Sequence, residues 1–269
     1  MSKRLISRFA WRRKHTRHSK VVLDAITADI CGQTVDHLAI TGDLTNFSVP
    51  EEFSAAQVWL KGLGDPTNVT VSPGNHDALV ASEGQMDFTA WQPWLGDAES
   101  TDFPNVRVRG PVAIVNLSSA VPTRVHLAQG TLGTPQVERA EALLQELGAS
   151  RLYRVVLLHH PLVEGVVARR KALTDSGAMR AALRRVGAEL VLHGHAHEAL
   201  LSAVPGPISD IPVMGIPSAS TPAGRQDDQA ARWNDIEIHR DGDAYRTQVT
   251  GREITAALGI VTTGRFVLA

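Results

Sequence analysis

A short apolar run that opens into a polar loop places the tightest constraint on what this chain can be. Residues 69–71 are β-branched and predict a buried strand, which a Pro-Gly turn ends at 73–74. Asn75, His76 and Asp77 follow directly, so an amide, an imidazole and a carboxylate stand side by side at a strand end. In open α/β sheets, ligands bind at such ends. The stretch therefore predicts part of a functional site.

Three other predicted strands end in side chains of the same kind. They are Asp43 after strand 38–41, His159 after strand 154–158, and His195 with His197 after strand 189–192. Each of these residues alone is also an ordinary turn or strand-end residue. Together, imidazole nitrogens with carboxylate and amide oxygens form the ligand set of a divalent transition metal. Four strand ends of this kind favour a metal site over a set of unrelated turns.

Apolar spacing predicts helices between these strands and a β meander after them. The expected helices cover 20–31, a segment from 48 to 63, 134–147 and 176–186, and each is followed by a glycine. The later strands are expected at 199–204, 213–216, 236–238, 245–249 and 265–268. This order predicts one domain over 21–269, with two sheets covered by helices, preceded by a basic arm over 1–20.

Composition narrows the class of protein. The 269 residues carry a net charge of −1 and are 43% hydrophobic, which is typical of a globular protein with a full core. Near-neutral charge makes nucleic acid an unlikely partner, and we find neither a transmembrane segment nor a signal-peptide core, so a cytoplasmic location is expected. The single cysteine, Cys31, excludes an internal disulfide and is expected to be buried in its helix.

The strand-end motifs resemble those of a known family. Gly42-Asp43, Gly74-Asn75-His76-Asp77, His159-His160-Pro161 and Gly194-His195-Ala196-His197 are similar, in this order, to the motifs of the calcineurin-like metallophosphoesterases. The wider likeness is to bacterial phosphodiesterase-like members, which include cyclic-nucleotide and glycerophosphodiester hydrolases. The resemblance implies an α/β (α+β) fold in the form of a four-layer αββα sandwich. It also implies two divalent metal ions (Mn, Fe or Zn) and a small-molecule phosphoester substrate.

Roles for the motif residues follow from the resemblance. Asp43 is expected to bridge both metals, Asn75, His159 and His195 to complete one metal site, and His197 to reach the other metal. Such a pair of ions lowers the pKa of a bound water and gives hydroxide for in-line attack at phosphorus.

Three further residues are expected to assist that site. His76 resembles the histidine that contacts the phosphate and helps the leaving group to depart, so it is the candidate catalytic residue. His160 and Asp77 are expected to orient the metal ligands.

One departure from the family pattern leaves two interpretations open. The family's first motif, Asp-x-His after a first strand, supplies two ligands to the metal shared with His197, yet no Asp-x-His precedes Asp43 and the first strand is apparently absent. His15 and His18 lie in the basic arm and do not follow a strand. Either the start codon is assigned too far downstream, or the chain is a shortened member with weak or no activity.

The leading hypothesis is thus a metal-dependent phosphoric ester hydrolase acting on phosphodiesters. The alternative is a non-catalytic binding or scaffold module, as in family members that have lost active-site residues. A nuclease that uses the basic arm is a weaker third hypothesis. The sequence leaves the metal, the exact substrate and the oligomeric state open.

Overall fold

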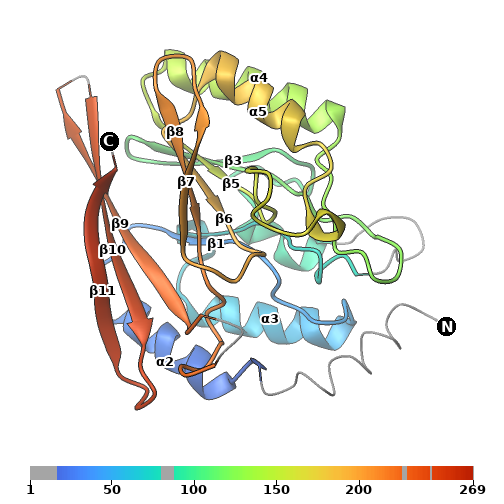
Figure 1. Cartoon of the computed structure of the whole chain (residues 1–269), viewed down its shortest axis with the longest axis vertical. Coiled ribbons are helices and arrows are strands. Elements are labelled where there is room, and N and C mark those ends of the chain that lie inside the picture. The colour runs from blue at the N-terminus through green and yellow to red at the C-terminus, as the bar shows by residue number, and fades with distance from the viewer. Residues whose placement is uncertain (1–16, 80–87, 226–228, 243, 269) are drawn as a thin grey trace.

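The computed structural model describes residues 17–79, 88–225, 229–242 and 244–268, and these form four layers (Figure 1). The outer layer contains α4 (Thr134–Ala149) and α5 (Ser176–Val186), which lie against a six-stranded sheet. Two smaller sheets pack on the other face of that sheet, and α2 (Lys20–Cys31) and α3 (Pro50–Gly62) cover them. The expected αββα arrangement is confirmed.

The six-stranded sheet has the order β3-β4-β5-β6-β8-β7. Its strands are Asn105–Arg109, Val112–Asn116, Tyr153–Leu157, Leu190–His193, Asp210–Gly215 and Leu200–Pro205, in that order across the sheet. The central strands β4, β5, β6 and β8 are parallel, whereas β3 and β7 are antiparallel edges. Because parallel strands end at the same edge, the loops after β5 and β6 are brought together.

The second strand layer consists of two separately hydrogen-bonded sheets in the described part of the chain. One is the parallel pair β1 (Leu38–Ile40) and β2 (Val69–Val71). The other is antiparallel, with order β11-β10-β9, and contains Arg232–Asp241, Ala244–Ile254 and Ile260–Leu268 as β9, β10 and β11. The sequence predicted two sheets in all, whereas the described residues form three. Three short 3-10 helices, Pro66–Asn68 (η2), Thr89–Trp94 (η3) and Arg169–Lys171 (η4), lie in the connections.

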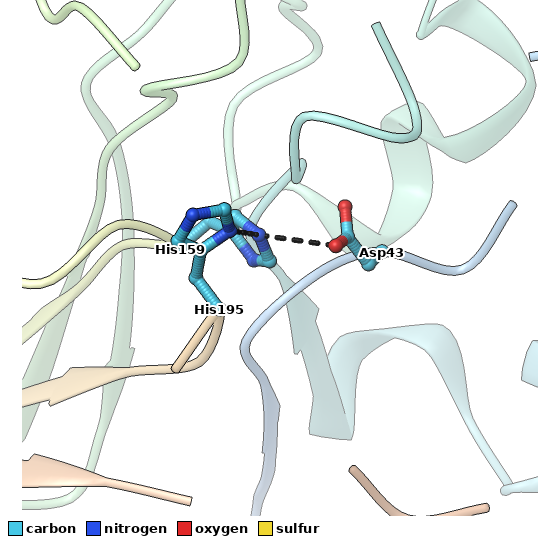
Figure 2. A group of neighbouring side chains, drawn as sticks. All are labelled: Asp43, His159 and His195. Atoms are coloured by element: carbon cyan, nitrogen blue, oxygen red, sulfur yellow. Dashed lines mark hydrogen bonds and ion pairs between the residues drawn. The ribbon is translucent and has the colours of Figure 1, made fainter. Parts of the chain in front are cut away.

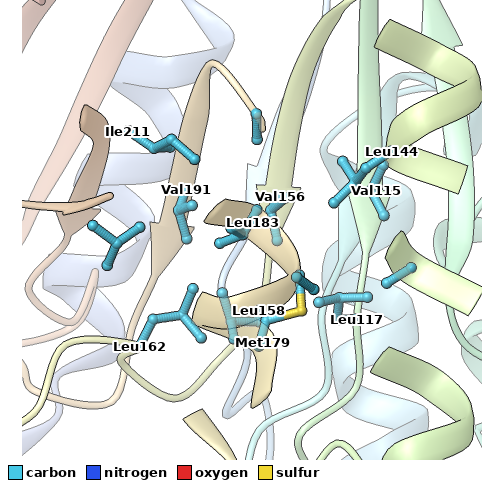
Figure 3. Close-up of a cluster of buried hydrophobic side chains, with 14 of the residues drawn as sticks. Val115, Leu117, Leu144, Val156, Leu158, Leu162, Met179, Leu183, Val191 and Ile211 are labelled. Carbon is cyan, nitrogen blue, oxygen red and sulfur yellow. The ribbon is translucent and has the colours of Figure 1, made fainter. Parts of the chain in front are cut away.

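Strands buried on both faces build two cores. On β4, Ala113 and Val115 face α4 and α5, while Ile114 between them faces the smaller sheets. Figure 3 shows the helix-side core, in which strand residues meet Leu144 and Met179. Such two-sided burial explains why these strands are apolar throughout rather than alternating.

Helix α2 packs on the outer face of the three-stranded sheet. Val22 and Ile26 are buried against Trp233 and Ile254, as the spacing predicts for one apolar face. The helix has the bounds expected from the sequence. Cys31 at its end is exposed, so the prediction that it is buried is wrong, because at 100° per residue Cys31 lies on the opposite side of the helix from Val22. No helix within the described ranges is long and apolar enough to cross a membrane.

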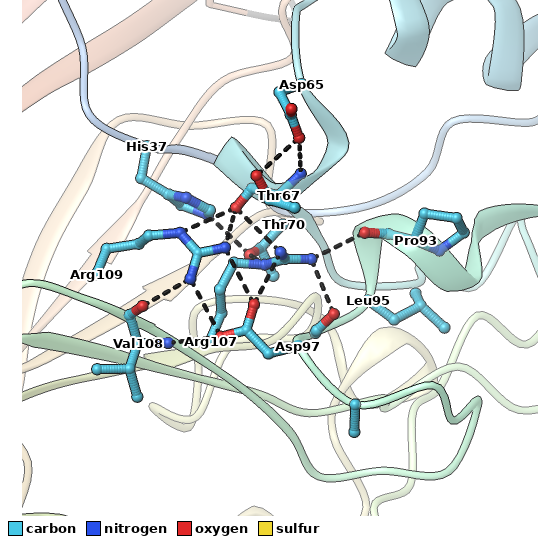
Figure 4. A network of polar contacts seen from close by, with 12 residues as sticks. His37, Asp65, Thr67, Thr70, Pro93, Leu95, Asp97, Arg107, Val108 and Arg109 are labelled. Carbon is cyan, nitrogen blue, oxygen red and sulfur yellow. Dashed lines mark hydrogen bonds and ion pairs between the residues drawn. The ribbon is translucent and has the colours of Figure 1, made fainter.

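A buried arginine ties β3 to the loops that surround β2 (Figure 4). The Arg107 guanidinium donates to Thr70 Oγ1, to Asp97 Oδ1 and to three backbone carbonyls, at 2.9–3.1 Å. Nε2 of His37 lies 2.8 Å from the same Thr70 hydroxyl. His37 is therefore held beside the positive charge of Arg107, which disfavours a proton on its ring.

This arrangement predicts a loss of stability in mild acid. Burial, with the charges of Arg107 and Arg109, lowers the pKa of His37 to about 4 from 6.5. The unfolded chain thus binds the proton more tightly between these values, and stability falls as pH drops through that window. We expect His37 to contribute roughly 2 kcal/mol of this loss, allowing for partial solvent screening. Urea unfolding of wild type and His37→Gln at pH 7 and 4.5 measures it; an equal loss in both proteins would contradict the prediction.

Candidate metal centre

Four of the predicted residues converge at the ends of β1, β2, β5 and β6. His159 Nε2 lies 3.2 Å from Asp43 Oδ2, 3.3 Å from Asn75 Oδ1 and 3.1 Å from His195 Nδ1. Figure 2 shows Asp43, His159 and His195, whose ligand atoms all lie within 4.8 Å of one another. Asn75, His159 and His195 are buried, and Asp43 is partly exposed.

The orientation of His159 makes this cluster suitable for a cation. Its Nδ1–H donates to the Thr41 carbonyl at 2.6 Å, so in the deprotonated ring, the form that binds a metal, the lone pair is on Nε2. That lone pair faces the oxygens of Asp43 and Asn75 and a ring nitrogen of His195. Four electron-rich atoms that converge in a buried place need a shared positive charge, and a divalent transition metal with N and O ligands supplies it. The residues present therefore fit the metal that their chemistry suggests.

The electrostatics of the cluster also favour a cation. Burial raises the pKa of Asp43. The positive charges of His159 and His76 outweigh this effect, so that the pKa of Asp43 lies well below its usual range. Burial lowers the pKa of His159, yet the Asp43 charge outweighs it and raises that pKa overall. Burial and the His159 charge lower the pKa of His195, which leaves its ring neutral. An ionised carboxylate beside a neutral imidazole is a ligand pair ready for metal.

The backbone of the cluster is strained where the ligands are. Asp43, His195 and His197 have φ of 61°, 63° and 59°, in the left-handed region that non-glycine residues rarely adopt. Such conformations collect at functional sites, where the surrounding structure enforces them. Gly74 is required for a different reason: any side chain there would overlap the Asp43 carboxylate.

Asp77 holds the two ligand loops together. Its carboxylate accepts from the backbone N–H groups of Asp43, Gly74 and Thr45 at 2.8–2.9 Å, and from the Thr45 hydroxyl at 3.1 Å. Burial and the Asp43 charge raise its pKa to about 6. The geometry supports the expected orienting role.

We expect Asp77→Asn to weaken metal binding by about 10- to 100-fold, the usual cost of losing a group that positions a ligand. The amide presents N–H where the carboxylate accepted, so at least one of these backbone donors loses its partner. Titration with Mn²⁺ measures the change, with Asp210→Asn on the exposed end of β8 as the control. Unchanged metal affinity in Asp77→Asn would show that the loops of Asp43 and Asn75 keep their positions without the Asp77 carboxylate.

His76 is positioned by both its backbone and its ring. Its N–H donates to Asp43 Oδ1 at 2.8 Å, and its Nδ1–H donates to the Asn46 carbonyl at 3.0 Å. Nε2 is then the ring atom left to exchange a proton. The ring is only half-buried, so a substrate can approach it.

His160 packs behind the cluster. Its ring lies 4.4 Å from that of His195, centroid to centroid, and it donates from Nε2 to the Ala128 carbonyl at 3.2 Å. Nδ1 therefore accepts from the Ser119 hydroxyl at 2.7 Å. Burial and the His159 charge lower the pKa of His160 to about 3, so it is a neutral support for its neighbours.

The structure does not bring His197 into the cluster of Asp43, His159 and His195. Its ring lies 6.3 Å from the ring of His18, edge to face, and His18 in turn contacts Ser220 Oγ at 2.8 Å. The segment before α2 thus lies beside the loop of His195 and His197, a placement that nothing in the sequence indicated. His15 lies outside the described residues.

Several groups that shape the site were missed by sequence reasoning. They are the carbonyls of Thr41, Asn46 and Ala128 and the Ser119 hydroxyl, each of which fixes a histidine. A carbonyl is present at every residue, so no sequence signal distinguishes these three. Ser119 follows β4, and its place at another strand end is the one signal that was available.

Comparison with known proteins agrees with this fold. The family model of the calcineurin-like phosphoesterases matches residues 17–199. A probable cyclic nucleotide phosphodiesterase of Synechococcus sp. is 25% identical over 228 residues, which is 84% of this chain and 80% of that protein. The crystal structure of a dimetal phosphatase from Danio rerio superposes with a TM-score of 0.60 at 13% identity, covering 89% of this chain and 88% of that one.

The chain belongs to the calcineurin-like phosphoesterase family. Its fold matches that of a dimetal phosphatase, and the family implies a hydrolase that uses divalent metal ions.

Proposed function

We propose that the protein is a metal-dependent phosphodiesterase. The convergence of Asp43, Asn75, His159 and His195 on one point is the observation that carries the proposal. The likeness to a probable cyclic nucleotide phosphodiesterase supports a diester substrate over a monoester.

These four residues would hold the metal, with His159 fixed by Thr41 and Asp43 fixed by Asp77. When bound, the ion supplies Lewis-acid polarisation of the phosphoryl oxygen and lowers the pKa of water. His76 lies at the open side of the cluster with Nε2 available, so it is placed to give a proton to the leaving oxygen. The hydrogen bonds of His76 to Asp43 Oδ1 and to the Asn46 carbonyl would hold its ring in one orientation during the reaction.

The test is turnover of bis(p-nitrophenyl) phosphate by protein loaded with Mn²⁺, Fe²⁺ or Zn²⁺, compared with p-nitrophenyl phosphate and with cyclic AMP. We expect hydrolysis of the diesters that a chelator removes and metal restores. His76→Asn should keep its metal and lose about 10²- to 10⁴-fold in kcat. Protein that holds metal yet hydrolyses no diester under any of these metals would overturn the proposal.

A non-catalytic binding module is the second candidate, and one observation favours it. Among the described residues, only Asp43, His159 and His195 form a metal-ligand cluster of imidazole and carboxylate groups, and His197 stands outside it. Metal content by elemental analysis separates the candidates: one ion with no turnover supports the module, whereas turnover at any stoichiometry supports the hydrolase.

A further inference from the structure

Three consecutive basic residues lie beside the metal centre and take no part in it. Arg169, Arg170 and Lys171 form η4. Both arginines are exposed, and Lys171 is half-buried. Within the described ranges, neither arginine forms an ion pair with a carboxylate, unlike Arg180 and Arg185 nearby. The two arginines therefore present positive charge that no carboxylate of the described ranges pairs with.

A network of hydrogen bonds fixes this run against a second loop. The Ala128 N–H donates to the Arg170 carbonyl at 3.0 Å, and Gln129 Nε2 donates to the Arg169 carbonyl at 3.0 Å. Gly130 continues the pairing through a short parallel bridge to Leu173. The two loops run side by side in Figure 1. The basic run is thus held by the fold, which reduces the entropy lost when it binds a ligand.

The same second loop touches the metal centre. The Ala128 carbonyl accepts from His160 Nε2 at 3.2 Å, and the His160 ring packs at 4.4 Å on His195. One residue, Ala128, thus joins the backbone of Arg170 to the ring behind a metal ligand.

We propose that Arg169 and Arg170 form an anion subsite that selects phosphoesters carrying a second phosphate group besides the scissile one. The inference rests on the proposed function, because the metal centre is taken to hold the scissile phosphate. The arginine fork matches a phosphate with two parallel hydrogen bonds, and an exposed guanidinium binds it in a salt-dependent way. A substrate without a second phosphate would bind no more tightly because of these arginines.

Binding of two nucleotides to the Mn²⁺-loaded protein tests the subsite. We expect wild type to bind thymidine 3′,5′-bisphosphate about tenfold more tightly than thymidine 5′-monophosphate at low salt, and to lose the preference in high salt. The double variant Arg169→Ala/Arg170→Ala should lose the preference while its affinity for the monophosphate stays the same. Arg240→Ala/Arg246→Ala, on the hairpin of β9 and β10, is the charge-matched control and should behave as wild type. A preference that survives in Arg169→Ala/Arg170→Ala, or none in wild type, overturns the proposal.

Turnover separates a failure of this inference from a failure of the proposed function. The p-nitrophenyl ester of thymidine 5′-phosphate is compared with the same ester carrying a 3′-phosphate, and the subsite predicts a ratio of kcat/KM that falls in the double variant. If neither ester is hydrolysed but the bisphosphate preference holds, the phosphodiesterase proposal fails and the anion subsite stands. If both are hydrolysed equally by wild type and by the double variant, the subsite fails and the phosphodiesterase stands.

Discussion

His195→Ala is expected to abolish metal binding at the cluster and hydrolysis of phosphodiesters together. The His195 Nδ1 is one of three ligand atoms around His159 Nε2, and it lies in a buried site where water replaces a lost ligand poorly. Titration with Mn²⁺ should show the loss of the tight ion, and turnover of bis(p-nitrophenyl) phosphate should fall below detection. His239→Ala, an exposed histidine on β9, is the matched control and should keep both properties.

A second variant separates ligand loss from backbone strain. His195 has φ of 63°, which alanine adopts less readily, so His195→Ala also changes the loop. His159 is not among the residues with positive φ, and His159→Ala removes a ligand without that effect. If His159→Ala still bound the ion with wild-type affinity, the cluster would not be the metal site.

The sequence was sufficient to predict which strand ends meet. Helices α2 and α5 have the expected bounds, and the strands before Asp43, Asn75, His159 and His195 were all predicted from short β-branched or apolar runs. Parallel pairing of β1 with β2, and of β5 with β6, then puts those ends at one edge. The residues form one site because the strands that carry them run in the same direction. A helix between two neighbouring strands makes them parallel, and the sequence predicts these helices.

The finer geometry of the site lay beyond sequence reasoning. Which nitrogen of His159 faces the cluster depends on the Thr41 carbonyl, and backbone carbonyls leave no trace in a sequence. The left-handed backbone at Asp43 and His197 is likewise a product of the assembled loops, because aspartate and histidine do not require it. The roles expected for His76 and His197 remain predictions.

Strand β3 was not predicted from the sequence, because a polar residue on it is buried in the core. Its sequence alternates Val106 and Val108 with Arg107 and Arg109, which suggests valines inside and arginines outside. The structure reverses this arrangement: Arg107 is buried at 1% exposure, and Val108 is exposed. The reversal is stable because Arg107 finds five acceptors, three of them 10 to 14 residues before it and two of them 37 and 40 residues before it.

Arg107→Met is therefore expected to lower the free energy of unfolding by roughly 3 kcal/mol, the typical cost of breaking a buried charged network from one side. Methionine fills much of the volume but donates no hydrogen bond, so the carbonyls of Thr67, Pro93 and Gly96 lose a partner in a place that water reaches poorly. Urea unfolding at pH 7 measures the loss.

Arg109→Met is the matched control, since Arg109 bonds the same Thr67 carbonyl and Asp97 carboxylate from a side chain that is 26% exposed. Its loss should be under about 1 kcal/mol, as for other solvent-screened pairs. Arg107→Lys then separates charge from geometry: lysine keeps the charge but cannot reproduce the planar fork, so a loss close to that of Arg107→Met assigns the stability to the hydrogen bonds. Equal losses in Arg107→Met and Arg109→Met would show that burial of Arg107 contributes nothing beyond its surface neighbour.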